Sequence, residues 1–145
     1  MLTERKQKDY FEKIIFPSFK YEKPNQILFS FLFKNRLIGY GGLVHINWGD
    51  KKGEVSFLLN PSRVKNILFY KNDFTVFLEF IKKIAYGDLK FNRLFTETFD
   101  LRRTHVKVLE KNNFKLEGRL KKHVCINNKF VDSLIHGNLN EYEKI

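Results

Sequence analysis

Apolar residues along this chain recur first at helical spacing and then in runs of strand length. The segment Glu4–Phe16 keeps its apolar positions on one helical face and precedes Pro17, which predicts an amphipathic helix. Glycines at positions 39, 41 and 42 interrupt an otherwise apolar strand pattern, which indicates a bulge or a close approach of two backbones. Turn residues separate three expected strands: Ile27–Phe33, Leu37–Trp48 and Glu54–Asn60.

The second half of the chain alternates helical and strand patterns. No clear period is present between Ser62 and Asn72, after which we expect Asp73 to cap a helix that Gly87 ends. A strand over Arg93–Phe99 follows, and Asp100 is expected to cap a further helix that ends at Asn112–Asn113. Two final strands, Phe114–Ile126 and Phe130–Ile135, are joined by a predicted hairpin turn at residues 127–129.

This order of elements predicts one domain over residues 1–145 with a mixed α/β (α+β) architecture. A chain of 145 residues buries roughly two-thirds of its unfolded surface in a single core, and sixteen Phe and six Tyr supply apolar volume for it. No apolar run reaches the length of about 18 to 20 residues that a membrane span needs. The single cysteine, Cys125, fits a reducing compartment. We therefore expect a cytoplasmic protein without a membrane partner.

The net charge of +11 favours an anionic ligand but gives no information about the fold. Basic residues are spread along the chain and never exceed two in a row, which makes nucleic acid an unlikely partner and leaves a polyphosphate ligand. Abundant Lys, Asn, Ile and Phe are also typical of a genome rich in A and T, so the charge has a second explanation. The four histidines are scattered at no metal-ligand spacing, and we expect no metal site.

The block from Phe91 to Gly137 resembles the C-terminal half of GNAT-type N-acetyltransferases. Its segments Leu116–Leu120 and Phe130–Ser133 are similar to the branch that acetylates protein N-termini and to the branch that acetylates amino sugars on nucleotide carriers. The resemblance implies a mostly antiparallel, twisted sheet flanked by helices, and acetyl-CoA as co-substrate. Too few residues precede Glu4 for the first strand and first helix of the family, so we expect an N-terminally shortened fold.

The resemblance also implies where coenzyme A would bind. In the family, the pyrophosphate rests on backbone N–H groups at a helix N-terminus, which attracts anions. The signature there is Arg or Gln, two residues, Gly, one residue, then Gly or Ala, and the expected segment lacks it, so an ordinary capped helix is the alternative. The residues implied are Lys71, Asn72, Asp73 and Phe74 for the pyrophosphate, and Leu58, Leu59 and Asn60, through their backbone, for the thioester.

Arg102 occupies a position where the family often has an Asn that contacts the pantetheine arm. Arg102 and Arg103 lie in the first turn of the expected helix, where a cation opposes the helix dipole and an anion would relieve the conflict. Two solvated arginines at an exposed turn are the alternative interpretation. Arg102 is therefore a candidate cofactor-binding residue.

Two glutamates are candidates for the base that frees the amine lone pair. Glu97 alternates with Phe95 and Phe99, and burial beside aromatic rings would raise its pKa toward the range useful for proton abstraction. Glu54, at the start of the third expected strand, is the competitor. The general acid is missing, because Leu109 stands where many relatives carry a tyrosine.

These residues favour an N-acetyltransferase that transfers acetyl directly to a primary amine. The acceptor implied is an amino sugar nucleotide or a protein N-terminus, with a slight preference for the sugar because the shortened N-terminus implies an open acceptor side. A non-catalytic GNAT-fold binding module with a degenerate coenzyme A site is the alternative. One sheet edge is expected to be unprotected, so we expect a homodimer.

Overall fold

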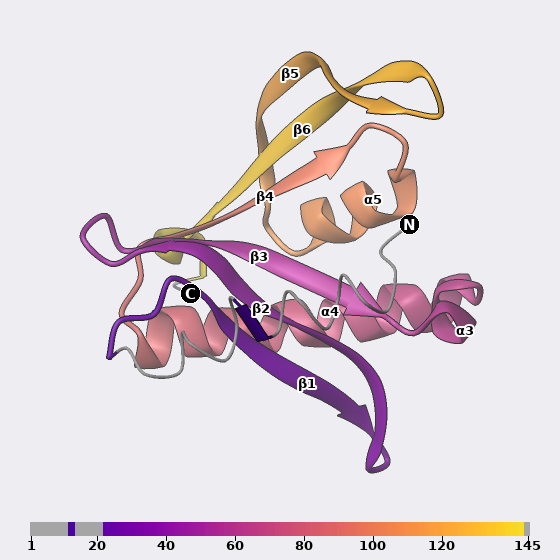
Figure 1. Cartoon of the computed structure of the whole chain (residues 1–145). Coiled ribbons are helices and arrows are strands. Elements are labelled where there is room, and N and C mark those ends of the chain that lie inside the picture. Colours follow the sequence, from indigo (N-terminus) through magenta and orange to yellow (C-terminus); the bar gives the residue numbers. More distant parts are fainter. Residues whose placement is uncertain (1–11, 14–21, 144–145) are drawn as a thin grey trace.

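A six-stranded sheet forms the centre of the computed structural model, which describes residues 12–13 and 22–143 (Figure 1). The strand order is β1-β2-β3-β4-β6-β5, and every neighbouring pair is antiparallel except β3 and β4, which are parallel. The predicted mixed, mostly antiparallel architecture is confirmed. The strands are β1 (Ile27–Phe33), β2 (Arg36–Asn47), β3 (Lys52–Leu59), β4 (Arg93–Phe99), β5 (Lys115–Ile126) and β6 (Lys129–Leu139).

Helices connect the strands in the second half of the chain. They are α3 (Pro61–Val64), α4 (Ile67–Lys82), its π-helical continuation η2 (Lys83–Asp88), α5 (Arg103–Lys111) and the short 3-10 helix η3 (Asn140–Glu143). Within the described part of the chain, no strand precedes β1. The helix predicted over Glu4–Phe16 lies outside the described residues, apart from Glu12 and Lys13.

Two hairpin turns have the left-handed backbone that their residues tolerate. Lys34 and Asn35 join β1 to β2 with φ of 48° and 61°, and Asn127 and Asn128 join β5 to β6 with φ of 49° and 60°. Positive φ at both central residues matches the right-handed twist of the flanking strands. The turn predicted at residues 127–129 is confirmed, and turn residues separate β1 from β2 as expected.

The glycines of β2 permit close packing. A Cβ on Gly41 would collide with Ser56 O on β3 and with the Phe77 ring on α4, and a Cβ on Gly42 would collide with Ile27 O on β1. The close backbone approach predicted from the glycine pattern is therefore confirmed.

The core lies between the sheet and one face of α4. Phe74, Phe77, Leu78 and Ile81 of that face are almost completely buried. Phe57 of β3 stacks on two of these rings, with centroid distances of 4.9 Å to Phe74 and 4.6 Å to Phe77. The apolar periodicity that predicted this helix thus identifies its buried face correctly.

Two predicted helix starts are wrong. The N-cap of α4 is Asn66, whose Oδ1 accepts hydrogen bonds from the N–H groups of Leu68 and Phe69, so α4 begins well before Asp73. The first turn of α4 is apolar but exposed, which is why no helical period is visible there. Asp100 does not cap α5 either: its carboxylate accepts a hydrogen bond from Arg119, and the cap position of α5 belongs to Arg102.

Strands β3 and β4 separate soon after they meet. They pair only where Lys52–Glu54 lie beside Arg93–Phe95, and beyond this point the two halves of the sheet diverge (Figure 1). Helices α4 and α5 both begin at the diverging end, and α5 runs between β4 and α4. The splay therefore opens next to two helix N-termini.

Candidate active site

The two predicted base residues line one small cavity in the splay. This splay cavity of about 190 Å³ is bounded by both carboxylates and, on another wall, by Arg102 and His105. Glu54 of β3 lies opposite Phe95 of β4 in the parallel register, and Glu97 is two residues after Phe95 on β4. The structure therefore brings Glu54 and Glu97 to one face of the sheet, beside one cavity.

Each carboxylate contacts a histidine from another strand: His45 is on β2, next to β3, and His123 is on β5, two strands from β4. His45 Nδ1 lies 2.5 Å from Glu54 Oε2, and His123 Nε2 lies 3.4 Å from Glu97 Oε1. The side chain of Glu54 is 18% exposed, and that of Glu97 is 33% exposed. The expected burial of Glu97 is wrong, because it is Leu94, Thr96 and Thr98 of β4 that face the interior. Glu54 is the more enclosed of the two.

A second hollow lies directly outside the splay, between the first turns of α4 and α5. This outer hollow of about 440 Å³ is lined by the cationic side chains of Lys65, Arg102 and Arg103. Two helix N-termini and three cations favour a strongly anionic group, and the pyrophosphate of coenzyme A fits that description. Since Arg102 and His105 line both spaces, the outer hollow and the splay cavity adjoin.

A buried chain of hydrogen bonds separates the two spaces. The Tyr70 hydroxyl lies 2.5 Å from His105 Nδ1, and Arg102 Nη2 donates to the same hydroxyl over 3.2 Å. Burial, reinforced by the positive charge of Arg102 and by His136, lowers the pKa of His105 to about 3, so its ring is neutral at physiological pH. Burial raises the pKa of Tyr70, against the opposing effect of Arg102.

The residues predicted to hold the pyrophosphate are not at a helix N-terminus. Lys71 and Asn72 lie in the second turn of α4 and line a separate hollow of about 320 Å³. Asp73 is buried and pairs with Arg63, whose Nε lies 2.5 Å from its Oδ2, and Phe74 belongs to the core. The difference follows from the start of α4, which lies at Asn66 and Ile67 and not at Asp73.

The segment predicted to hold the thioester lies at the free end of β3. Leu58 is half exposed, Leu59 is buried, and Asn60 Oδ1 accepts a hydrogen bond from Ser62 N at the start of α3. Among the described residues, β3 from Val55 onward has no strand partner on the side of β4. Backbone groups along this edge are thus directed into the splay, although their part in binding stays a prediction.

The sequence contains one signal for the true start of α4. Arg63, two residues, Asn66, one residue and Leu68 reproduce the spacing of the family signature, with Asn and Leu in place of the small residues. This spacing ends at the observed start of α4. Tyr70 and His105 gave no such signal, because they are 35 residues apart and meet only in the fold.

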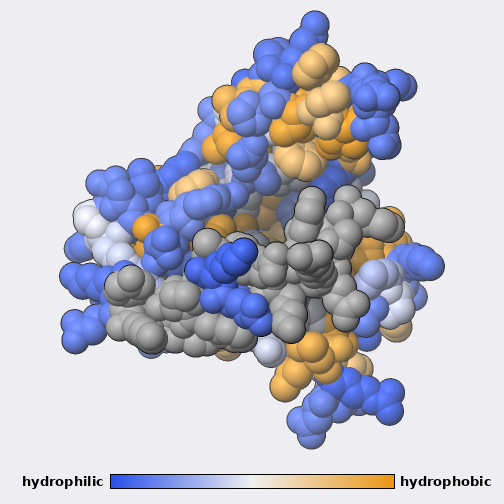
Figure 2. All heavy atoms as spheres, viewed as in Figure 1, coloured by the Kyte–Doolittle hydropathy of each residue, from blue (hydrophilic) through white to orange (hydrophobic). Residues whose placement is uncertain are grey.

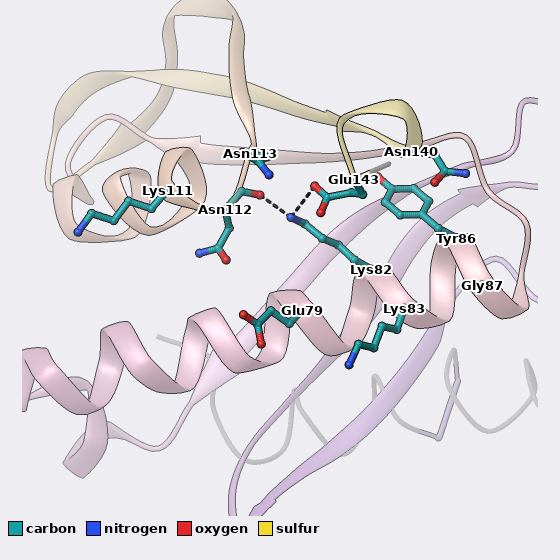
Figure 3. A pocket seen from close by; sticks show the side chains of 10 residues that line it. All are labelled: Glu79, Lys82, Lys83, Tyr86, Gly87, Lys111, Asn112, Asn113, Asn140 and Glu143. Atoms are coloured by element: carbon teal, nitrogen blue, oxygen red, sulfur yellow. Dashed lines mark hydrogen bonds and ion pairs between the residues drawn. The ribbon is translucent and has the colours of Figure 1, made fainter. Parts of the chain in front are cut away.

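The largest of these hollows is at the opposite end of α4 (Figure 3). It measures about 610 Å³ and lies beside η2 and η3. Its buried lysine, Lys82, donates to Asn112 O over 2.5 Å and to Glu143 Oε1 over 2.9 Å (Figure 3). This charge is already satisfied, and the hollow is remote from the splay, so we do not assign the chemistry to it.

Two parallel strands that diverge beside two helix N-termini, with a cationic hollow between them, are typical of acyltransferases that use coenzyme A thioesters. The sequence model of the acetyltransferase (GNAT) domain matches residues 2–135. The chain therefore belongs to the GNAT acetyltransferase family. It is an acetyltransferase, and enzymes of this family use acetyl-CoA as the co-substrate that donates the acetyl group.

Solved structures of similar fold include spermidine N-acetyltransferases from Vibrio cholerae. A chimera of the enzyme SpeG has a TM-score of 0.78 and 17% identity, over 98% of this chain and 80% of that one. A dodecameric spermidine N-acetyltransferase has a TM-score of 0.77 and 16% identity, over 97% and 77%. A probable acetyltransferase has a TM-score of 0.76 and 18% identity, over 92% and 74%.

Two negative findings apply to the described residues. None of their helices is long and apolar enough to cross a membrane. Their His, Cys, Asp and Glu side chains form no group of three or more that could hold a metal ion.

Proposed function

We propose that this chain is an N-acetyltransferase that moves acetyl from acetyl-CoA directly to a primary amine in a ternary complex. The observation that supports this proposal most directly is that Glu54 and Glu97 line the splay cavity, which adjoins the outer hollow. A carboxylate positioned beside the reacting amine accepts the proton that the amine must lose. The cationic outer hollow would hold the pyrophosphate of the donor, so the acetyl group and the base meet in the splay.

The acceptor we propose first is a cationic amine such as a polyamine. Two carboxylates at one cavity attract a positively charged substrate and hold it with charge-assisted hydrogen bonds. Structurally similar proteins are spermidine N-acetyltransferases, which is consistent with this class of acceptor.

An amino sugar on a nucleotide diphosphate is the second acceptor class. The observation that favours it is the net charge of +11, because a basic surface attracts a diphosphate. A protein N-terminus is the third acceptor class. The three classes differ in charge, so their relative turnover distinguishes them.

A radiolabelled acetyl-transfer assay tests the proposal. The purified chain is incubated with acetyl-CoA and, in turn, with spermidine, an amino sugar nucleotide and a short peptide. We expect the highest kcat/KM with spermidine and a loss of about 100-fold in Glu54→Gln or Glu97→Gln, the size typical of a general base. Glu79→Gln, in the remote hollow, is the matched control and should keep full activity. Absence of transfer to every acceptor would contradict the proposed function.

A further inference from the structure

Tyr70 and His105 form a hydrogen-bonded pair where the outer hollow adjoins the splay cavity. Tyr70 comes from α4 and His105 from α5, and only 7% and 8% of their surfaces are exposed. Both line the outer hollow, and His105 also lines the splay cavity. His105 therefore borders the cavity that the two carboxylates line.

The neighbours of the pair fix where its protons lie. The Arg102 guanidinium can only donate, so the Tyr70 oxygen accepts its hydrogen bond and the Tyr70 proton is directed to His105 Nδ1. A neutral imidazole with Nδ1 as acceptor carries its own hydrogen on Nε2. Among the described residues, the hydrogen bond to this ring engages Nδ1 and leaves Nε2–H available.

We propose that His105 donates its Nε2 proton to the departing coenzyme A sulphur and that Tyr70 resupplies the ring through Nδ1. The inference rests on the proposed acetyl transfer. As the bond between acetyl carbon and amine nitrogen forms, the carbon–sulphur bond breaks and its electron pair stays on sulphur. Sulphur takes the Nε2 proton, Nδ1 takes the phenol proton, and Arg102 stabilises the phenolate. The resting state returns when the Nδ1 proton goes back to the phenolate and water gives Nε2 a new proton.

Other side chains near the splay are poorer donors. Leu109, one turn after His105 on α5, has no proton to give. Arg102 lines the same cavity, but a guanidinium retains its proton at physiological pH. His105 is thus the candidate catalytic residue, and Tyr70 is a positioning residue that acts through it.

Paired variants and a spectroscopic measurement test the relay. Tyr70→Phe removes only the hydroxyl, and His105→Phe keeps a ring to stack on Phe74, whose centroid lies 4.3 Å from that of His105. We expect each to lower kcat about 100-fold with KM for acetyl-CoA changed less than twofold, and the double variant to be no slower. The control is Tyr86→Phe, a tyrosine in η2 that binds Asn138 and should retain kcat. Nitrogen NMR of labelled histidine should show the Nε2–H tautomer in the wild type, with an Nδ1 resonance that shifts in Tyr70→Phe because the hydroxyl no longer donates to Nδ1.

The outcomes separate the relay from the acetyl transfer itself. A Tyr70→Phe enzyme as fast as Tyr86→Phe would overturn the relay, as would losses that multiply in the double variant. A ring protonated on Nδ1 in the wild type would overturn it independently of activity. An inactive wild type would contradict the proposed function, and the relay with it.

Discussion

At the scale of single residues, the site depends on side chains that meet across the sheet. Glu54, Glu97 and His105 come from three different elements yet line one cavity. None of them is within reach of another along the sequence, so their meeting depends on the splay of β3 and β4. The residue types are ordinary, and their placement gives the site its chemistry.

His105 gives the folded chain a defined pH dependence. Its pKa falls from 6.5 to about 3 on folding, so the unfolded state binds more protons between these values. The stabilising effect is complete above pH 6.5 and is lost as pH falls toward 3. From pH 7 to pH 5, we expect the wild type to lose about 2 kcal/mol in unfolding free energy through this residue.

Urea unfolding at the two pH values checks this expectation. His105→Phe removes the titrating group and should flatten the change between pH 7 and pH 5. His123, which is half exposed beside Glu97, provides a control in His123→Gln. An equally steep pH dependence in wild type and His105→Phe would show that His105 is not the group responsible.

At the scale of elements, the true start of α4 has a measurable consequence. Asn66→Ala removes the side chain that caps Leu68 and Phe69 and should cost about 1 kcal/mol of unfolding free energy. Asn72→Ala, at an exposed position inside the same helix, should be neutral or slightly stabilising because alanine is the better helix former. Denaturant unfolding of both variants decides the point, and the reverse ranking would place the helix start near Asp73.

The close approach around β2 is equally specific. Gly41→Ala would force a methyl group against Ser56 O and Phe77, and overpacking of this kind costs about 1 to 3 kcal/mol. Gly118→Ala in β5 is the matched control, since nothing lies within 4 Å of its added Cβ. Thermal unfolding should therefore show a lower Tm for Gly41→Ala alone, and two unchanged Tm values would refute the packing described here.

Elements with a regular apolar period could be predicted from the sequence, whereas their caps could not. Strand β4 was predicted with its observed bounds, Arg93–Phe99, and the turns at Asn35 and Asn128 followed from residues that tolerate positive φ. The start of α4 was missed because its first turn exposes Ile67, Leu68 and Phe69, which breaks the amphipathic pattern. Asp100 was a poor guide to α5 because Arg119 competes for its carboxylate.

At the scale of the whole molecule, β1 and β5 are the unpaired edges of the described sheet. Figure 2 shows apolar side chains gathered just before the hydrophilic tip of the β1–β2 hairpin and near the β5–β6 hairpin. Phe130 of β6 is 69% exposed, and Leu116 and Leu120 of β5 are also exposed. We propose that the surface formed by Leu116, Leu120 and Phe130 supports a homodimer. An edge strand with exposed apolar residues favours pairing with a second copy of the chain.

Light scattering on the eluting protein tests the dimer. The wild type should elute with the mass of two chains, and Phe130→Asp should shift it toward one. Leu68→Asp changes an exposed leucine on α4 and should leave the mass unchanged. A monomeric wild type at high protein concentration would contradict the dimer without affecting the site.

The family could be predicted from the resemblance of the block Phe91–Gly137, and the match of the family model to residues 2–135 confirms it. The location of the pyrophosphate could not, since it depends on one helix boundary. The choice of Arg102 as a candidate cofactor-binding residue does not depend on that boundary, because Arg102 lines the outer hollow together with Lys65. The acceptor class depends on where the carboxylates of Glu54 and Glu97 lie. The alternating pattern of β4 put Glu97 on the same side as Phe95 and Phe99, but it could not show that Glu97 lines a cavity with Glu54.

Calorimetric titration with acetyl-CoA tests the central claim, that the outer hollow and splay cavity hold the acetyl donor. We predict micromolar binding to the wild type and binding at least about tenfold weaker to Lys65→Gln/Arg102→Gln, because two cations would no longer face the pyrophosphate. Lys83→Gln, in the remote hollow, should bind as the wild type does. No detectable binding to the wild type, or equal affinity in all three proteins, would contradict the site described here.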